Sequence, residues 1–242
     1  MDRPRSAIAR LAVARPLRSF TADDLITEAC QLQKLQVRHV AVRRQQVNVI
    51  GEHTLRHVLD DHGIRISCLG FAGGFTGALG LSYQNAVSDV QKAIAVAAEL
   101  GAGRIVIVPG ERGTHTYRHA ERTVRDGLAD CIESASAHQI RLLVPTDTVL
   151  GGPSDCFRPQ RSLLQWVDDL RCDTIRAMVV VRGASGAFRL PRGWREHVAS
   201  GGCIRICHRC RNYAENARLL QSILRFLGHS DIGTSVDGGR CD

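Results

Sequence analysis

The chain has 242 residues, a formal net charge of +8 and a hydrophobic content of 44%, which is ordinary for a folded globular protein. No apolar run approaches the ~20 residues that a membrane-spanning helix needs. Arg10 and Arg15 interrupt the apolar stretch near the N-terminus, so a signal peptide is not indicated either. The composition therefore argues against a protein with membrane-spanning helices, and we expect a cytoplasmic one.

The positive charge comes almost entirely from arginine, since Lys34 and Lys92 are the only lysines. A nucleic-acid-binding domain usually gathers its basic residues on one face or in one segment. In this chain the arginines are spread over the whole sequence, so we do not expect a nucleic-acid partner from the charge alone. A small anionic ligand remains compatible with the composition.

Nine cysteines are present, and several fall inside expected helices or strands. We therefore expect reduced, mostly buried thiols rather than a disulfide framework. Cys207 and Cys210 have the spacing of a zinc knuckle, and Cys203 lies shortly before them. Zinc needs a second pair of ligands, and none appears with comparable spacing. A metal site at these three cysteines is thus the weaker alternative to buried thiols.

Short apolar runs alternate with longer amphipathic ones from the start of the chain. A strand is predicted over 10–14, a helix over 22–35 with Thr21 as its N-cap, a strand over 37–43, a helix over 52–61 and a strand over 64–70. The clearest unit comes next, with a helix over 83–100 that ends at Gly101 and a strand over 103–108 that ends at Pro109-Gly110. This strand is apolar on consecutive residues, which is typical of a parallel sheet covered on both faces.

The second half of the chain repeats the pattern. Its expected elements are a helix over 115–138, a strand over 140–146, a helix over 161–170, a strand over 176–182, a short helix over 194–198, a strand over 203–208, a helix over 214–227 and a strand over 232–236. Eight strands separated by helices predict a single-domain (β/α)8 TIM barrel over residues 1–242. The last expected strand ends six residues before residue 242, so we expect the final outer helix to be truncated, missing or replaced by a partner subunit in a homo-oligomer.

Several short motifs occur in a characteristic order. VRHVAVRRQQV carries Arg43 at the end of the second strand, GIRISCLGFAGGFTG ends the third at Gly73-Gly74-Phe75, and ELGAGRIVIVPGERG ends the fourth at Pro109-Gly110. This order resembles the sugar phosphate isomerase/epimerase family, the xylose isomerase-like TIM barrels. The resemblance covers roughly the first 150 residues. It implies a barrel that moves a proton between carbons next to a carbonyl in small sugars and polyols.

The resemblance also implies a divalent ion, Mg, Mn, Co or Zn, held by two Glu, an Asp and a His at the strand ends. In this sequence Val144-Pro145 stands where the first Glu is expected, and Val181-Arg182 stands where the Asp is expected. His208 lies near the family's His position, while the last Glu is matched by Ser235 or, with a shift, by Asp237. A hard cation that loses two carboxylates loses most of its ligand charge. We therefore predict that this chain holds no metal cofactor.

Residues that follow the barrel strands are the candidates for function, because the carboxyl end of a TIM barrel carries its chemistry. The candidate catalytic acid-base residues are Glu111, His115, Asp147 and His208, and the candidate substrate-binding residues are Arg43, Phe75 and Arg182. Each motif has a structural alternative. Glu111 and His115 can belong to a solvated loop in which Thr114 caps the next helix, and Asp147 can form a local Asx turn.

Three functional hypotheses follow. The first is a protein that has lost the family's metal site and binds a small sugar-like or anionic ligand, without catalysis or with altered chemistry. The second is an active sugar or cyclitol isomerase or epimerase that uses acid-base residues of the rim. The third, a relative that acts on abasic sites in DNA, is the weakest, because that chemistry uses several zinc ions held at many strand ends.

Overall fold

The computed structural model describes residues 15–77, 80–145, 156–157, 163–182 and 203–207. Within these residues, strands form one sheet in the order of the sequence, and every neighbouring pair is parallel. The strands are β1 (Arg15–Pro16), β2 (His39–Arg43), β3 (Arg65–Gly73), β4 (Arg104–Val108), β5 (Arg141–Pro145), β6 (Ile175–Arg182) and β7 (Cys203–Cys207). This sequential parallel order is the predicted TIM-barrel arrangement.

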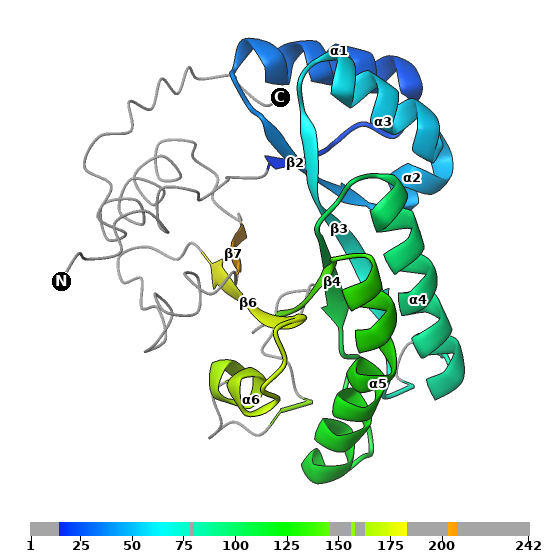
Figure 1. Ribbon diagram of the computed structural model, residues 1–242, viewed down its shortest axis with the longest axis vertical. Coiled ribbons are helices and arrows are strands. Elements are labelled where there is room, and N and C mark those ends of the chain that lie inside the picture. The colour runs from blue at the N-terminus through cyan, green and yellow to red at the C-terminus, as the bar shows by residue number, and fades with distance from the viewer. Residues whose placement is uncertain (1–14, 78–79, 146–155, 158–162, 183–202, 208–242) are drawn as a thin grey trace, which may run out of the picture.

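Helices connect the strands and lie along the outer face of the curved sheet (Figure 1). They are α1 (Ala22–Lys34), α2 (Arg44–Ile50), α3 (Glu52–Asp61), α4 (Tyr83–Glu99), α5 (Tyr117–Ala137) and α6 (Leu163–Asp169). The long helices are amphipathic. In α4 the residues that share one face, Ala86, Val90, Ala93, Ile94 and Ala97, are buried against the sheet side of the molecule.

The helix starts show which cap predictions were correct. Thr21 caps α1 as predicted, because its hydroxyl accepts a hydrogen bond from the Asp24 amide at 3.2 Å. The predicted cap of α5, Thr114, is wrong. Thr116 takes that role by accepting from the His119 amide at 3.3 Å, so the helix begins at Tyr117.

Two further elements differ from the prediction. Helix α2 was not expected; it is a short helix that buries Gln46, Val47 and Ile50 and ends at Gly51, where φ is +89°. The described part of the first strand, Arg15–Pro16, comes directly after the predicted range 10–14, which lies outside the described residues. The expected helices over 194–198 and 214–227 and the expected strand over 232–236 also lie outside them.

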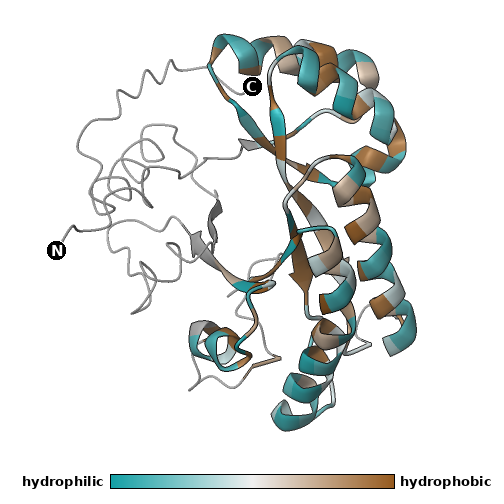
Figure 2. Ribbon diagram, viewed as in Figure 1, coloured by the Kyte–Doolittle hydropathy of each residue, from teal (hydrophilic) through white to brown (hydrophobic). Residues whose placement is uncertain are grey.

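The core has two layers, which follow from the alternation of side chains along each strand. The outer layer fills the space between sheet and helices and includes Val40, Ile66, Ile105, Leu142 and Ile175. The inner layer lies on the opposite face of the strands, inside the barrel, where Val106, Leu143 and Met178 pack with Cys68 and Phe71. Figure 2 shows the matching distribution, with hydrophobic residues concentrated on the strands and hydrophilic ones on the outer surfaces of the helices.

None of the described helices is both long enough and apolar enough to cross a bilayer.

Candidate functional site

The carboxyl ends of the parallel strands meet at one rim of the barrel, which is where TIM-barrel sites are built. The rim residues that the structure describes follow β1 to β4 and end β5. Arg43 ends β2, Phe75 and Thr76 follow β3, and Glu111 and His115 follow β4. The sequence-predicted candidates Asp147 and His208 lie outside the described residues, as does the side chain of Arg182.

Gln46 on α2 fixes the ends of the first two strands. Its side chain is fully buried, and the Nε2 atom donates to the carbonyl oxygens of Leu17 at 3.0 Å and Ser19 at 2.8 Å. Its Oε1 atom accepts from the Arg43 amide at 2.9 Å. A buried amide that makes all these bonds holds its neighbours rigidly, because leaving any of them unpaired is costly. Sequence reasoning missed Gln46, since a single Gln in a polar segment carries no signal.

Arg43 itself presents an exposed side chain at this rim. Its guanidinium lies over the ring of Phe20 at 6.0 Å from the centroid, a distance at which cation–π attraction acts. The next residue, Arg44, pairs with Asp89 of α4 at 2.6 Å and also donates to the Phe71 carbonyl at 3.5 Å, so its guanidinium is already engaged. The other carboxylate oxygen of Asp89 accepts from the Gly73 amide at 3.4 Å. Of the two arginines, Arg43 is therefore the one that can meet a ligand.

The loops after β3 and β4 are tied together at close range. The Gly74 amide donates to the Val108 carbonyl at 2.8 Å, and the Thr76 hydroxyl donates to the Glu111 carbonyl at 2.6 Å. Gly73 has a φ of +122°, and a Cβ atom there would lie 2.4 Å from the Val108 carbonyl oxygen. A Cβ atom on Gly110, where φ is +104°, would lie 2.3 Å from the Thr76 hydroxyl. Glycine is required at both positions, because the chains approach too closely for any side chain.

Phe75 lies in the core rather than at the surface of the mouth. Its side chain is 2% exposed, and a Cβ atom on Gly127 of α5 would lie 2.4 Å from its ring. The ring therefore packs against the bare backbone of α5, behind the loop that was predicted to contact substrate. Its described contacts are packing contacts.

Glu111 and His115 lie in the same loop after β4. The Glu111 side chain is exposed, and its backbone carbonyl is held by Thr76. The His115 side chain is half-buried, and its Nε2 atom lies 3.3 Å from the Thr76 carbonyl oxygen, so this nitrogen donates in that contact. The His115 ring also lies 4.7 Å from that of His119. Arg112 steadies the loop, because it donates to the His115 carbonyl at 2.7 Å and lies over Tyr117 at 4.8 Å.

The end of β5 carries no polar side chain. Pro145 is the last residue of the strand, is buried, and pairs in register with Met178 of β6. Because Leu143 belongs to the inner layer, the alternation of the strand places Pro145 on the same inward face. Strand β6 continues to Arg182, which pairs in register with Cys207 of β7.

Of the five described cysteines, Cys131 and Cys156 are buried as predicted, and the other three are half-buried. Cys30, Cys68, Cys131, Cys156 and Cys172 are all free. Burial, helped by the charge of nearby Asp130, raises the pKa of the Cys131 thiol to about 12. The side chains of Cys203 and Cys207 and the whole of Cys210 lie outside what the structure describes, so the metal alternative for them stays a prediction.

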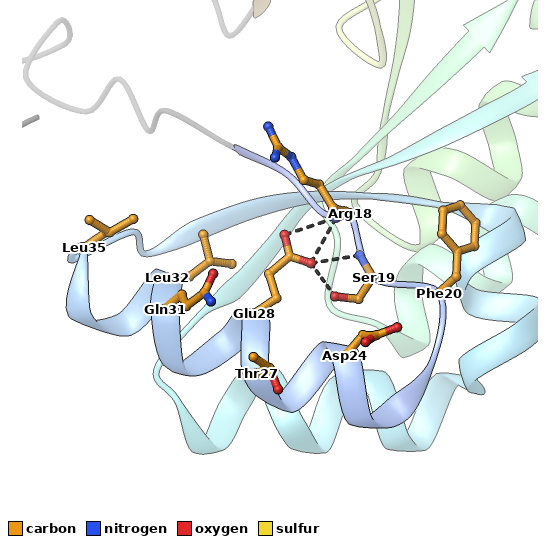
Figure 3. Close-up of a pocket in the computed structure, with 9 residues that line it drawn as sticks. All are labelled: Arg18, Ser19, Phe20, Asp24, Thr27, Glu28, Gln31, Leu32 and Leu35. Carbon is orange, nitrogen blue, oxygen red and sulfur yellow. Dashed lines mark hydrogen bonds between the residues drawn. The ribbon is translucent and has the colours of Figure 1, made fainter. Parts of the chain in front are cut away.

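A surface hollow of about 430 Å³ lies beside the rim, between the segment after β1 and helix α1 (Figure 3). Glu28 projects from α1 toward the segment after β1 and accepts hydrogen bonds from the backbone amides of Arg18 and Ser19 and from the Ser19 hydroxyl. This carboxylate is therefore engaged in holding the segment after β1. The hollow contains none of the predicted site residues, so we treat it as a consequence of this local structure.

No set of three or more His, Cys, Asp and Glu residues able to hold a metal ion occurs among the residues that the structure describes. Pro145 and Arg182 stand where the sequence resemblance places two of the metal ligands. The Pro145 side chain has no donor atom, and Arg182, which ends β6, is a cation by residue type.

The sheet, its outer helices and the polar rim at the carboxyl ends define a parallel α/β barrel of the TIM type. The model of the xylose isomerase-like TIM barrel family matches residues 30–178, which is more than half of the sequence. The chain belongs to the xylose isomerase-like TIM barrel family.

Solved structures of low sequence identity share this fold. The apo 3-keto-D-glucoside 4-epimerase of E. coli is 11% identical, with a TM-score of 0.65 over 90% of this chain and 99% of that one. A D-psicose 3-epimerase studied in the presence of D-fructose is 12% identical, with a TM-score of 0.62 over 90% and 100% of the two chains. A family 2 AP endonuclease from Brucella melitensis is 12% identical, with a TM-score of 0.61 over 87% and 97%. The comparison with curated proteins gives no match.

Proposed function

We propose that the barrel mouth binds a small sugar-like or anionic ligand, and that the divalent-metal site of the family has been lost. The observation that carries this proposal is Pro145, a buried residue on the inward face of β5 at the point where the family resemblance places a metal-binding Glu. A proline side chain offers neither charge nor a lone pair to a cation. The fold is kept around it, so the substitution removes the ligand without removing the barrel.

The neighbouring strand strengthens this argument. Where the resemblance places an Asp, β6 ends in Val181 and Arg182. A site for Mg²⁺ or Mn²⁺ depends on carboxylate oxygens, and replacing two of them removes two negative charges. A guanidinium in their place adds a positive charge that repels a cation and attracts an anion. We therefore derive no catalytic step through a metal.

What the rim offers a ligand is a set of fixed polar groups. Arg43 is exposed and held at its amide by Gln46, so its guanidinium is free to bind a carboxylate or a sugar hydroxyl. Glu111 and His115 are presented by a loop that Thr76 fixes at both residues. Similar proteins are named as sugar epimerases, and one of them was studied with D-allulose, which supports a sugar-like ligand.

A second candidate function uses the same loop. Glu111 and His115 come from one segment, one side chain being exposed and the other half-buried, and such a pair can act as base and acid on a carbonyl sugar. This alternative is an isomerase or epimerase that works without a metal. This alternative predicts turnover that survives chelation. It would be ruled out if Glu111→Gln left that turnover unchanged.

Calorimetric titration in the presence of EDTA tests the main proposal. D-fructose and D-glucuronate serve as the neutral and anionic probes. We expect saturable binding of D-glucuronate that chelation does not affect, and a loss of roughly tenfold in affinity in Arg43→Gln, since a charge-assisted bond contributes about 1.5–3 kcal/mol. Arg44→Gln is the matched control, because the Arg44 guanidinium is already paired with Asp89. Binding of sugars only after addition of Mn²⁺ would contradict the proposal.

A further inference from the structure

Basic residues stand at the start of five consecutive strands, at the amino end of the barrel, opposite the rim. Each lies one residue before an outer-layer core residue of the same strand, at the end where the strand begins. The set, called the amino-end cluster below, consists of His39 on β2, Arg65 on β3, Arg104 on β4, Arg141 on β5 and Arg176 on β6.

All five residues lie on the inward face of the sheet. The next residue along each strand, such as Ile105 after Arg104, packs in the outer layer between sheet and helices. Side chains alternate between the two faces of a strand, so the preceding residue faces the barrel interior. Val106 and Leu143 lie two positions further along β4 and β5 and belong to the inner layer. Their position confirms that Arg104 and Arg141 face inward. The arginines that are scattered in the sequence are thus gathered on one inner surface.

Strand pairing brings basic residues next to each other within this cluster. His39 pairs in register with Arg65, and Arg104 pairs in register with Arg141. Like charges on directly neighbouring strand positions destabilise a sheet. Burial lowers the pKa of His39, and the charges of Arg65 and Arg104 on the next two strands lower it further. The electrostatic effect therefore reaches across strands. The cluster therefore gathers positive charge at this end of the barrel.

The compensation inside the described part of the chain is incomplete. Asp173 binds Arg176 at 2.6 Å, and Arg176 also donates to the Cys172 and Ile175 carbonyls. By contrast, the side chains of His39, Arg65 and Arg104 make no hydrogen bond or ion pair with another described residue. Arg65 is exposed, while His39 and Arg104 are half-buried, so solvent and small solutes can reach them.

We propose that the amino-end cluster binds a compact anion with two or more negative charges, such as a phosphate ester or a pyrophosphate group. Arg65 and Arg104 would supply the guanidinium forks that bind phosphate oxygens, and His39 would line the same site. The position inside a barrel end limits the size of the ligand. An eight-stranded barrel has an interior just wide enough for side chains or one small ligand, so a compact anion fits better than the long backbone of a nucleic acid.

Isothermal titration calorimetry of the full chain with inorganic pyrophosphate, at constant ionic strength set with NaCl, tests this proposal. We expect saturable binding by the unmodified protein. In the double variant Arg65→Gln/Arg104→Gln the affinity should fall roughly tenfold or more, because two charge-assisted contacts are lost. Without the anion, the same variant should be at least as stable to heat as the unmodified protein, because it relieves repulsion.

Two controls make the result specific. Arg118→Gln/Arg125→Gln removes the same charge from exposed positions on α5 and should leave the affinity within about twofold. Arg43→Gln tells the two ends of the barrel apart, because weaker pyrophosphate binding in this variant would place the anion at the opposite rim and overturn the proposal. Equal weakening in the α5 variant, absence of saturable binding, or binding of oligonucleotides but not of pyrophosphate would each overturn the proposal. If the double variant does not fold, Arg65→Gln alone, at an exposed position, must show a weaker version of the same loss.

Discussion

The two ends of this barrel use charge in different ways. At the carboxyl-end rim, Arg44 is paired with Asp89, and Arg112 is bonded to the His115 carbonyl and lies over Tyr117. At the amino end, Arg65 and Arg104 line the interior without a hydrogen-bonding partner among the described residues. The amino end of a TIM barrel normally serves stability, whereas the carboxyl end carries function. In this protein the end that usually stabilises the barrel also carries arginines that have no ion-pair partner among the described residues.

This difference indicates which residues hold the barrel together and which are available to ligands. The rim is built from buried bonds and close backbone contacts around Gln46, Gly73 and Gly110, so substitutions there should cost stability. The amino-end cluster makes few such contacts, so substitutions there should change charge-dependent behaviour instead.

Gly73→Ala should be the most damaging of these substitutions. The new Cβ atom would lie 2.4 Å from the Val108 carbonyl oxygen at a φ of +122°, so the β3 and β4 ends would have to separate. We expect a loss of roughly 3 kcal/mol in the free energy of unfolding, measured by urea denaturation. Gly103→Ala is the matched control near the amino end. It has an ordinary φ and no atom within 4 Å of the new Cβ, and should change stability by about 0.5 kcal/mol or less. Equal losses would contradict the rim geometry.

Gln46→Leu should also destabilise the rim, by about 2–3 kcal/mol. The substitution keeps the buried volume but leaves the carbonyls of Leu17 and Ser19 and the amide of Arg43 without their partner. The exposed neighbour Gln45→Leu is the control and should have little effect. Hydrogen exchange of the Arg43 amide gives a second readout, since its protection should fall in the first variant and not in the second.

The smallest effect concerns the pH dependence of stability. Burial and the charges of Arg65 and Arg104 lower the pKa of His39 below its ordinary value of 6.5. The unfolded chain therefore binds the proton more readily, so the contribution of His39 to stability is complete above pH 6.5 and is lost as the pH falls from there to the lowered value. His39→Gln should flatten this part of the profile of thermal midpoint against pH. A steeper profile in the variant would contradict the assigned direction.

The sequence predicts the order of the elements well, because buried parallel strands and amphipathic helices leave strong periodic signals. It misses α2, since a short helix that buries Gln46 in a polar segment has no such pattern. It also misplaces the cap of α5, because Thr114 and Thr116 are equally good N-cap residues and only the path of the loop decides between them. For Phe75, the Gly-Gly-Phe motif locates the turn but cannot show that the ring faces α5.

The amino-end cluster shows a different limit of sequence reasoning. Along the chain, Arg65, Arg104 and Arg141 are far apart and look like a dispersed excess of arginine. Parallel strands bring the first residues of successive elements to one end of the sheet, and their register places His39 beside Arg65 and Arg104 beside Arg141. The signal was present as a basic residue directly before several apolar runs. It becomes readable only when the strand boundaries and register are known.

The central claim, that this barrel has lost its family's metal site, is tested most directly by titrating chelator-treated, full-length protein with Mn²⁺ in a calorimeter. The matched variant Pro145→Glu/Arg182→Asp restores the two expected carboxylates. We predict no stoichiometric Mn²⁺ binding by the unmodified protein, and tighter binding by the variant, because two anionic ligands are returned to a hard cation. One Mn²⁺ bound per unmodified chain, with a matching rise in thermal stability, would contradict the account.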